Sequence, residues 1–363
     1  MSHISFDRWS KKQESTPPST SDESPDRYGF LHVKTTGSST NAHRSTKQSS
    51  KSTVSQENNR LRTEKGRIKK WNKMLNSANI EKYRSTRKII TRARKGIPDT
   101  LRAQAWFILA GADKLLQAQP DLYDQLQHHG DSKWEGQILL DVDRTYPNHI
   151  KFREVGGEGQ RTLFRILRAY SIHDSEVGYC QGIGFLAAFL MVYMSEIKVF
   201  WMLCAIMRGE RFNLCHMYTD GMKKAILIMS TMDQLLILKD PALATHLEGM
   251  MIQSPMYMTG WIMTLFTSTF SFDFVVRIWD AFLTEGDAKI LYRIALALLK
   301  EISSSLLKMD MEHTLKTLQG LPSSLIMLLS PDELMLKAES IRITTSQVKK
   351  IEKKIDESKA KKT

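Results

Sequence analysis

"GIGFLAAFLMVYM", residues 182–194, is the most apolar run of the chain, and it decides what kind of fold the chain adopts. It is followed at once by Ser195, Glu196 and Lys198, which mark a polar boundary. Its 13 residues are too few for a membrane-spanning helix, which needs about 20. We therefore expect a helix that is buried in the core of a globular domain.

Segments of helix length recur on both sides of this run, whereas strand-like alternation bounded by turns is nearly absent. Upstream, "KGIPDTLRAQAWFILAG" (residues 95–111) predicts a turn at Pro98, an N-cap region at Asp99 and Thr100, and a helix that Gly111 ends. Downstream and centrally we expect helices over 158–172, 179–194, 197–208, 221–238, 255–270, 272–284 and 287–307. The pattern predicts an all-α fold, built as an array of helices.

The formal charge of +13 in 363 residues is concentrated at the flanks of the chain. Residues 1–59 contain 8 Lys/Arg against 6 Asp/Glu, residues 60–95 contain 14 against 2, and residues 349–363 contain 7 against 3. Together these flanks carry +18, which leaves 96–348 with a net charge of −5. A length of this order allows one large or two medium domains. The body is therefore mildly acidic, which argues against a nucleic-acid-binding body.

The N-terminal residues 1–59 include 21 Ser/Thr and few aliphatic side chains, so we expect disorder there. One island, "PDRYGFLHV" (residues 25–33), carries two aromatic residues. We expect it to dock on the folded body, with a chance aromatic patch as the alternative. At the other end, residues 345–363 are typical of a basic solvated helix or a disordered tail.

The basic segment 60–95 begins as an amphipathic helix, with Ile68, Trp71, Met74 and Leu75 on one face. Three interpretations stay open: a solvated helical face, attraction to an anionic membrane or acidic protein, or nucleic-acid binding. Lysines beside Trp71 and Tyr83 suit a membrane interface. No recognised nucleic-acid-reading module accompanies the charge, so we expect no nucleic-acid partner.

Other features bear on location and enzyme chemistry. Cys180, Cys204 and Cys215 lie in apolar or helical surroundings without zinc-ligand spacing, which is typical of a reduced, intracellular protein. The N-terminus lacks the apolar core of a secretion signal. "GGEGQRTLF" (residues 156–164) lacks the Lys-Ser/Thr of a phosphate-binding loop. We expect no self-contained enzyme chemistry, no metal and no cofactor.

Two short motifs remain. In "ILLDVDRTYP" (138–147), Asp141 and Arg144 stand three residues apart, where an acid can hold a guanidinium in one rotamer. In "EVGYCQGIGF" (176–185), Gln181 lies between Gly178 and Gly182 at the start of the apolar helix. An arginine that neutralises phosphoryl oxygens and a glutamine that orients water are what phosphoryl transfer to water requires. On spacing alone, a surface salt bridge remains the simpler interpretation.

Taken in order, "KGIPDTLRAQAW", "ILLDVDRTYP", "VGYCQGIGFLAAFL" and "VVRIWDAFLTEG" followed by "ILYRIALALLK" resemble the successive signature blocks of the TBC domain family. Members of that family are all-helical GTPase-activating proteins for Rab small GTPases. The resemblance implies a two-lobed helical domain over 96–321, a basic lead-in over 60–95 and a C-terminal extension over 322–363. The "DRYGF" from Asp26 also resembles a segment found ahead of the domain in some members.

The resemblance implies a role for each matching residue. Arg144 would enter the Rab nucleotide site as an arginine finger, and Gln181 would replace the water-orienting glutamine of the Rab. Arg102 would be a buried ion-pair partner that supports the helix carrying Arg144. The remaining supporting positions match the same blocks: Asp141, Thr145, Tyr179 and Gly182. A departure follows "YCQG" (residues 179–182), where Ile183 and Gly184 replace the usual Met-Asn.

The implied partner is a Rab GTPase in its GTP-bound form, which itself holds the GTP and Mg²⁺. The implied function is to switch off Rabs of membrane trafficking, from a cytoplasmic location that includes peripheral association with endomembranes. The alternative is a scaffold or effector of the same fold that binds a Rab without catalysis.

Overall fold

The computed structural model describes residues 24–31, 50–76 and 86–360, and in these ranges it is helical without a β-strand. Disorder is predicted over 1–59, and most of that stretch, residues 1–23 and 32–49, lies outside the described residues. The prediction is wrong for 50–59, which belong to helix α2 (Ser50–Leu75). The amphipathic second half of α2 is anchored on the body, and a helix that is already nucleated extends readily into a polar segment.

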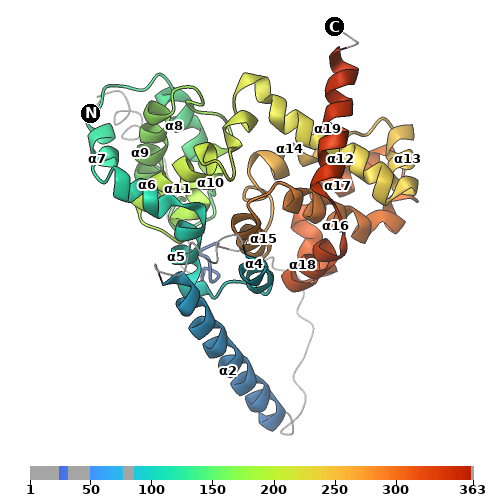
Figure 1. Cartoon of the computed structure of the whole chain (residues 1–363), viewed down its shortest axis with the longest axis horizontal. Helices are drawn as coiled ribbons and strands as arrows, with labels where there is room; N and C mark the ends of the chain where they lie inside the picture. The colour runs from blue at the N-terminus through green and yellow to red at the C-terminus, as the bar shows by residue number, and fades with distance from the viewer. Residues whose placement is uncertain (1–23, 32–49, 77–85, 361–363) are drawn as a thin grey trace.

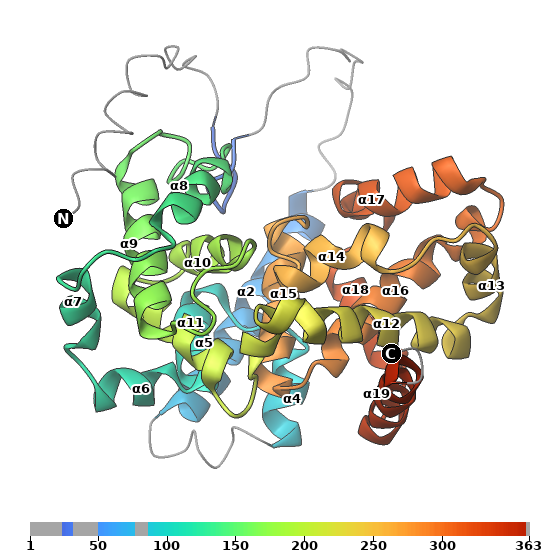
Figure 2. The same cartoon turned by 90° about the horizontal axis from the view of Figure 1, so that it is seen from above.

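The helices form two lobes, as the all-α prediction and the family resemblance implied (Figure 1). The N-terminal lobe contains α5 (Asp99–Ala110), α6 (Ala112–Ala118), α7 (Leu122–Gln127), α8 (Glu135–Arg144), α9 (Glu158–His173), α10 (Ile183–Met191) and α11 (Glu196–Arg208). The C-terminal lobe contains α12 (Lys223–Lys239), α13 (Pro241–Gly249), α14 (Pro255–Met263), α16 (Lys289–Leu306), α17 (Met311–Leu328), α18 (Pro331–Ser340) and α19 (Thr345–Ala360). Helix α15 (Phe272–Glu285) lies between the two groups (Figure 2).

The predicted helix ends hold within a few residues except at two turns. The segment 179–194 becomes helical only at Ile183, because Gly178 and Gly182 adopt φ values of +56° and +108°. The segment 255–270 stops at Met263, because Leu265 and Phe266 take left-handed φ values of +46° and +69°. No sequence signal marks the second turn, since large apolar residues rarely adopt this conformation.

The apolar run forms the centre of the core, as predicted. In α10, the buried Phe189 packs its ring against Trp106 of α5 and Trp279 of α15, with centroids 5.5 and 5.0 Å away. Trp106 and Trp279 also contact each other, with their centroids 5.8 Å apart. Three helices from both halves of the chain thus meet in one aromatic cluster, which keeps the lobes in register.

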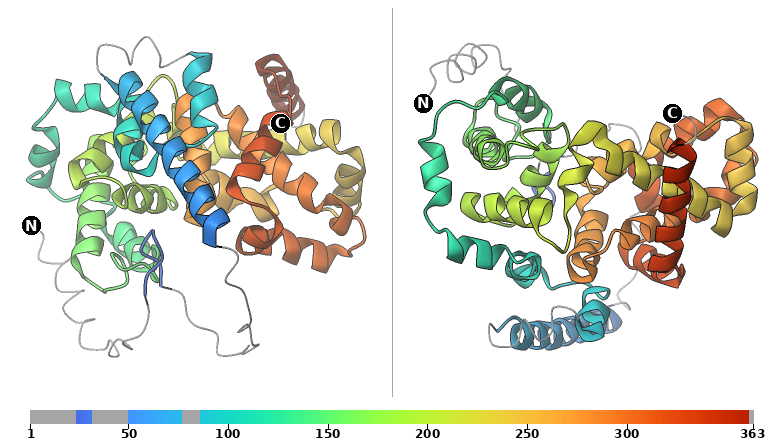
Figure 3. Two further views of the ribbon diagram at one scale, coloured as in Figure 1. Left: turned by 90° about the horizontal axis from the view of Figure 1, so that it is seen from below. Right: turned by 45° about the horizontal axis from the view of Figure 1, so that its top comes forward.

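The basic flanks fold onto this body. Helix α2 lies against α5 on the underside of the molecule, beside the short helix α4 (Arg87–Ala93) (Figure 3). Trp71 of α2 is 1% exposed, so its indole belongs to the core, as its place on the apolar face of the amphipathic helix indicates. It is therefore not available to a membrane interface, which was one of the three open interpretations of this segment. Tyr83 lies outside the described residues. Helix α19 buries Val348 against the C-terminal lobe.

The predicted boundary at residue 321 falls inside α17, so the domain and its C-terminal extension share a helix. Across the parts of the chain that the structure describes, we find no helix with the length and apolarity that crossing a membrane requires.

Candidate functional site

Arg144 is the last residue of α8, and its side chain is 52% exposed. Asp141, one turn earlier, is only 9% exposed at its side chain, and its Oδ1 lies 2.5 Å from the Arg144 Nη2. The helix ends here because Thr145 turns to an extended conformation ahead of Pro147. The guanidinium is therefore tethered at one edge and open to solvent over the rest.

The second oxygen of Asp141 connects this arginine to the glutamine motif. The Tyr179 hydroxyl donates a 2.6 Å hydrogen bond to Asp141 Oδ2, and the Thr145 hydroxyl donates one of 2.7 Å to the Asp141 carbonyl. Burial raises the pKa of Tyr179, and the hydrogen bond to Asp141 raises it further, so the phenol stays a donor. A single carboxylate thus joins α8 to the turn that precedes α10.

Gln181 occupies that turn with its side chain exposed. Buried residues stand on both sides of it: Tyr179 is 2% exposed, and Gly182 packs closely on the end of α14. A Cβ at Gly182 would come within 3.1 Å of the Met263 carbonyl oxygen, and its φ of +108° disfavours any other residue. Burial raises the pKa of Cys180, which keeps this neighbour a neutral thiol rather than a nucleophile.

The departure at Gly184 lies in the same network. A Cβ at this position would come within 3.2 Å of the Tyr179 hydroxyl and 3.5 Å of the Thr145 Oγ1. Glycine therefore leaves room where Tyr179 and Thr145 reach Asp141. The hydrogen bonds that flank Gln181 do not depend on a side chain at position 184.

Tyr146, which sequence reasoning missed, fixes the chain immediately after Arg144. It adopts a φ of +49°, and its hydroxyl donates a 2.7 Å hydrogen bond to the Thr267 carbonyl. Its ring packs edge-on against Phe30, Phe185 and Phe272, with centroids 5.3 to 5.5 Å away. Such a backbone conformation costs about 1–3 kcal/mol and persists only where the surroundings enforce it.

Residues 24–31, which we call the N-terminal strap, cover the loop beyond Tyr146. Asp26 Oδ1 accepts 2.9 Å hydrogen bonds from the amides of Tyr28, Gly29 and Phe30, which closes a tight turn. The predicted docking segment 25–33 thus lies on the body over its described part. Residues 32–33 lie outside the described residues.

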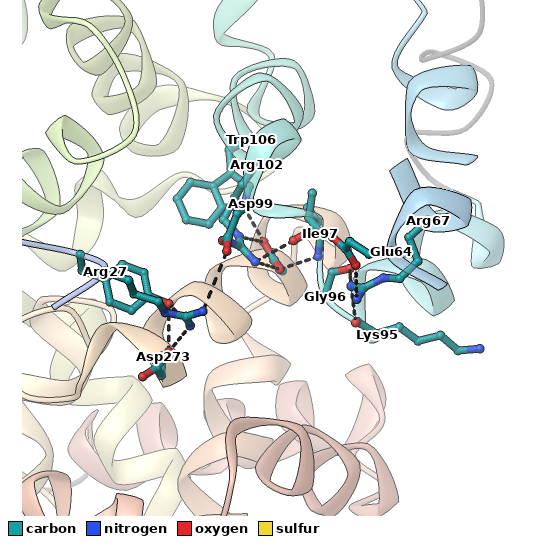
Figure 4. Close-up of polar contacts among 12 residues, drawn as sticks. Arg27, Glu64, Arg67, Lys95, Gly96, Ile97, Asp99, Arg102, Trp106 and Asp273 are labelled. Carbon is teal, nitrogen blue, oxygen red and sulfur yellow. Dashed lines mark hydrogen bonds and ion pairs between the residues drawn. The ribbon is translucent and has the colours of Figure 1, made fainter. Parts of the chain in front are cut away.

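The strap pairs with the loop through its backbone. The Leu31 amide donates to the Asn148 carbonyl, and the Ile150 amide donates to the Gly29 carbonyl, both at 2.9 Å. Phe30 also packs on the His149 ring, with their centroids 4.9 Å apart. At its other edge, Arg27 pairs with Asp273 at the start of α15 (Figure 4). The strap therefore clamps the loop that follows Arg144 to the central helix.

Arg102 lies elsewhere. It is 4% exposed and bonds Asp280 of α15 through Nε at 3.2 Å and the Ile97 carbonyl through Nη2 at 2.7 Å (Figure 4). Asp280, at 0% exposed, also accepts 2.8 Å hydrogen bonds from the Trp106 indole and the Ile97 amide. The prediction that Arg102 supports the helix carrying Arg144 is therefore corrected. These bonds of Arg102 join α5 to α15, and they do not involve α8.

The arrangement presents two exposed polar side chains, a guanidinium and an amide, on one buried scaffold. Both side chains are accessible to another molecule from the surface. Among the described residues, no three His, Cys, Asp or Glu side chains gather as a metal-binding group. The chemistry that such a pair can perform is stabilisation of charge and orientation of water in a bound partner.

Comparisons with known proteins agree with the geometry. The Rab-GTPase-TBC domain family matches residues 99–307. TBC1 domain family member 10B of Mus musculus is 36% identical over 260 residues, which are 70% of this chain and 32% of that protein. Rab GTPase-activating protein eat-17 of Caenorhabditis elegans is 33% identical over 283 residues, which are 78% of this chain and 31% of that protein. The matched part is thus about a third of the length of these relatives.

Two solved structures share the architecture. The Chlamydomonas flagellar RabGAP TBC domain superposes with a TM-score of 0.67 and 25% identity, over 88% of this chain and 100% of that one. The Ypt/Rab-GAP domain of Gyp1p superposes with a TM-score of 0.64 and 21% identity, over 76% of this chain and 97% of that one, a likeness of fold alone.

Proposed function

This chain belongs to the Rab-GTPase-TBC domain family, and from that premise we propose that it accelerates GTP hydrolysis by a Rab-family GTPase. In this proposal it binds the Rab in its GTP-bound form and contributes two catalytic side chains, Arg144 and Gln181. The Rab holds the GTP and the Mg²⁺, and this chain holds neither. Its biological effect would be to switch off a Rab of membrane trafficking.

The arginine acts on charge. As the bond to the γ-phosphoryl group breaks, negative charge grows on the phosphoryl oxygens and on the leaving oxygen. A planar guanidinium can donate two parallel hydrogen bonds to such oxygens. Asp141 holds Arg144 in one rotamer before the Rab arrives, so less side-chain entropy is lost on insertion. An arginine supplied in trans accelerates this reaction by about 10³–10⁵.

The glutamine acts on the nucleophile. A neutral amide can accept a hydrogen bond from the attacking water while it donates one to a phosphoryl oxygen. Gln181 is exposed between Tyr179 and Gly182, which are buried on either side of it. That placement presents the amide from a fixed backbone and supports its role as the water-orienting group.

One observation carries the proposal: Asp141 binds Arg144 through one carboxylate oxygen and Tyr179, two residues before Gln181, through the other. A surface salt bridge needs no such second connection. The link keeps the arginine and the glutamine turn in a constant relative position, which supports a shared function for the two side chains.

The test is single-turnover GTP hydrolysis by a panel of Rabs, with the wild-type chain, Arg144→Ala and Gln181→Ala. We expect each substitution to reduce the acceleration by about 10³-fold or more. Arg165→Ala is the matched control, since Arg165 is also a half-exposed arginine with acidic partners but lies on α9. A wild-type chain that binds the GTP-bound Rab without accelerating hydrolysis would establish the scaffold alternative.

We also propose that the chain works from the cytoplasm, peripherally on endomembranes, with its basic 60–95 flank against anionic lipid. The supporting observation is the charge distribution, +12 over that flank against a net −5 over 96–348. Each cationic residue near an anionic surface contributes about 1 kcal/mol of attraction. Cosedimentation with phosphatidylserine vesicles at low and high salt tests this association. An affinity that does not fall as the salt concentration rises would contradict it.

A further inference from the structure

Leu140, one helical turn before Arg144, is exposed although its neighbours in the chain belong to the core. Its exposed fraction is 56%, the highest among the large apolar side chains of residues 99–208, all of which the structure describes. Ile138 and Leu139, directly before it, are 0% and 5% exposed. A single exposed leucine is ordinary on a protein surface, so the exposure by itself indicates nothing. The position of Leu140 relative to Arg144 is what gives it a meaning.

Leu140 and Arg144 lie on the same face of α8. An α-helix turns by about 100° per residue, so residues four apart differ by about 40° around the axis and about 6 Å along it. Their Cβ atoms are then about 5–6 Å apart. Asp141 lies about 60° from Arg144 on the other side, where it meets Tyr179 of the glutamine turn. The guanidinium therefore stands between a polar side, which leads to Gln181, and an apolar side, which Leu140 forms.

The rest of this helix face is open and uncharged. The exposed residues of α8 are Gly136, Gln137, Leu140 and Arg144, and Arg144 is the one charged residue among them. A Cβ at Gly136 would meet no atom of another segment within 4 Å, so the described parts of the chain leave that end of the face uncovered. The opposite side of α8 packs on α9 and α10. Depletion of charge is typical of the core of a protein interface, whereas its rim is polar.

In the proposed function, the Rab must cover Leu140 whenever Arg144 acts. A guanidinium reaches phosphoryl oxygens inside another protein only if the surface around that nucleotide closes over the helix that carries the arginine. Leu140 is nearer to Arg144 than the diameter of one helix, about 10 Å. The closing surface therefore cannot avoid Leu140, and the apolar area that it removes from water contributes to the affinity.

We propose that Leu140 is a recognition residue for the GTP-bound state of the Rab, and that it packs on apolar side chains of a segment that the γ-phosphate orders. In small GTPases the segments beside the γ-phosphate and its Mg²⁺ are ordered by these groups and are released on hydrolysis. An apolar contact with such a segment exists before hydrolysis and is lost after it. Leu140 thus favours binding of the substrate and release of the product, whereas Arg144 and Gln181 act on the reaction. This inference rests on the proposed function, because it requires that Arg144 enters the nucleotide site of the Rab.

The experiment replaces Leu140 by a polar side chain of similar size. Leu140→Asn removes the apolar contact without adding a charge beside Arg144, and Leu140→Met keeps the contact. Leu336→Asn is the matched control, since Leu336 is 67% exposed and, like Leu140, is the sixth residue of a ten-residue helix. The helix of Leu336, α18, belongs to the C-terminal lobe, whereas α8 belongs to the N-terminal lobe (Figure 1). The two Asn substitutions therefore make the same change of residue type in the same kind of helix position.

The measurements use the full chain and the Rab of the panel whose hydrolysis it accelerates most, or which it binds most tightly. Single-turnover hydrolysis over a range of concentrations of this chain separates the maximal rate from the half-saturating concentration. Binding is measured to the same Rab loaded with a nonhydrolysable GTP analogue or with GDP. Urea denaturation midpoints that agree with wild type show that the variants fold.

We expect Leu140→Asn to raise the half-saturating concentration by about 5–30-fold, as loss of most of the burial of one leucine predicts. The maximal rate should stay within about threefold of wild type, because the contact does not change in the transition state. The affinity for the GTP-analogue form should fall by about the same 5–30-fold factor, and the affinity for the GDP form should change less. Leu140→Met and Leu336→Asn should each change these quantities by less than about threefold.

Three results would overturn the inference and leave the proposed function in place. A lower maximal rate at an unchanged half-saturating concentration would show that Leu140 holds Arg144 rather than the partner. Equal losses of affinity for the GTP-analogue and GDP forms would remove the selectivity for the nucleotide state. Unchanged kinetics with Leu140→Asn, or an equal loss with Leu336→Asn, would remove the contact itself.

The proposed function can also fail separately. If wild type bound the GTP-bound Rab without accelerating hydrolysis, and Leu140→Asn weakened that binding, the proposed catalysis would fail and the contact would stand. If wild type neither bound nor accelerated any Rab of the panel, both proposals would fail.

Discussion

Two arginine–aspartate pairs in this molecule have the same chemistry and opposite surroundings. Arg144 and Asp141 sit on one helix, three residues apart, and the guanidinium is 52% exposed. Arg102 and Asp280 come from α5 and α15, with side-chain exposures of 5% and 0%. The first pair leaves most of its guanidinium hydrogen-bonding capacity for another molecule. The second pair uses its capacity inside the fold, together with the Trp106 indole and the Ile97 amide.

The difference shows how to distinguish a functional arginine from a structural one. An exposed ion pair contributes about 0–1 kcal/mol to stability, so stability alone does not explain a tether on Arg144. Loss of one partner of a buried pair costs about 3–5 kcal/mol, because a charge is left without compensation. Substitution of Arg144 should therefore change the activity and leave the free energy of unfolding nearly unchanged. Substitution of Arg102 should mainly lower the free energy of unfolding.

The largest expected effect is that of Arg144→Lys. A lysine keeps the positive charge beside Asp141 but cannot reproduce the planar fork of donors. We expect the acceleration of Rab GTP hydrolysis to fall by about 10³–10⁵, which is roughly 4–7 kcal/mol of barrier. The free energy of unfolding should change by less than about 1 kcal/mol. Single-turnover kinetics and urea denaturation measure the two quantities, and wild-type kinetics would contradict the assignment.

Next in size is the effect of Arg102→Met on stability. The substitution leaves Asp280 buried without its cation and frees the Ile97 carbonyl. We expect the free energy of unfolding to fall by about 3–5 kcal/mol. Arg165→Ala, at a half-exposed ion pair, should change it by less than about 1 kcal/mol. Denaturation curves in which the two variants coincide would remove the distinction between the pairs.

A smaller effect is expected where the two motifs meet. Tyr179→Phe removes the hydroxyl that bonds Asp141 Oδ2 and leaves the volume of the ring in place. Loss of one hydrogen bond to a charged group is worth about 1.5–3 kcal/mol, so we expect kcat to fall by about tenfold or more. Asp141→Asn should act in the same direction. An unchanged kcat with a raised KM would show that the link serves Rab binding rather than positioning.

The N-terminal strap should contribute less than this link. Phe30→Ala removes ring contacts with Tyr146, His149 and Phe272, each worth about 0.5–1.5 kcal/mol. We expect a several-fold lower kcat and faster hydrogen exchange of the Ile150 amide, which bonds the Gly29 carbonyl. Ser24→Ala is the control, because Ser24 is exposed at the start of the same strap and takes no part in the contacts described above. Unchanged exchange at Ile150 in Phe30→Ala would show that the strap does not hold the loop.

These expectations also show how far the sequence could predict the fold and the site. Helices are short-range features, so 158–172 and 272–284 agree with α9 and α15 almost to the residue. Arg144 and Gln181 could be identified because each sits in a compact motif. The partner of Arg102 is 178 positions away, and the backbone of Tyr146 carries no residue-type signal. Both depend on packing between distant segments, which periodicity does not contain.

The smallest expected effect is a pH dependence at His149, under the strap. Its Nε2 lies 2.7 Å from the Tyr28 carbonyl, and its Nδ1 accepts a hydrogen bond from the Lys151 amide, so the ring is neutral with its proton on Nε2. Burial lowers the pKa of His149. The Tyr28 hydrogen bond opposes this shift, the Lys151 charge adds to it, and Asp26 opposes it.

The pKa of His149 in the folded chain lies below its value in the unfolded chain, which is about 6.5. At pH values between these two, the folded state therefore binds fewer protons than the unfolded state. The stability contributed by neutral His149 is therefore present above about pH 6.5 and is lost as the pH falls through the folded pKa. We expect the free energy of unfolding to decline over that interval more in wild type than in His149→Gln. His173, whose pKa burial also lowers, is common to both proteins and cancels in the difference. Parallel curves would show that the strap holds the loop after Arg144 without any contribution from the charge state of His149.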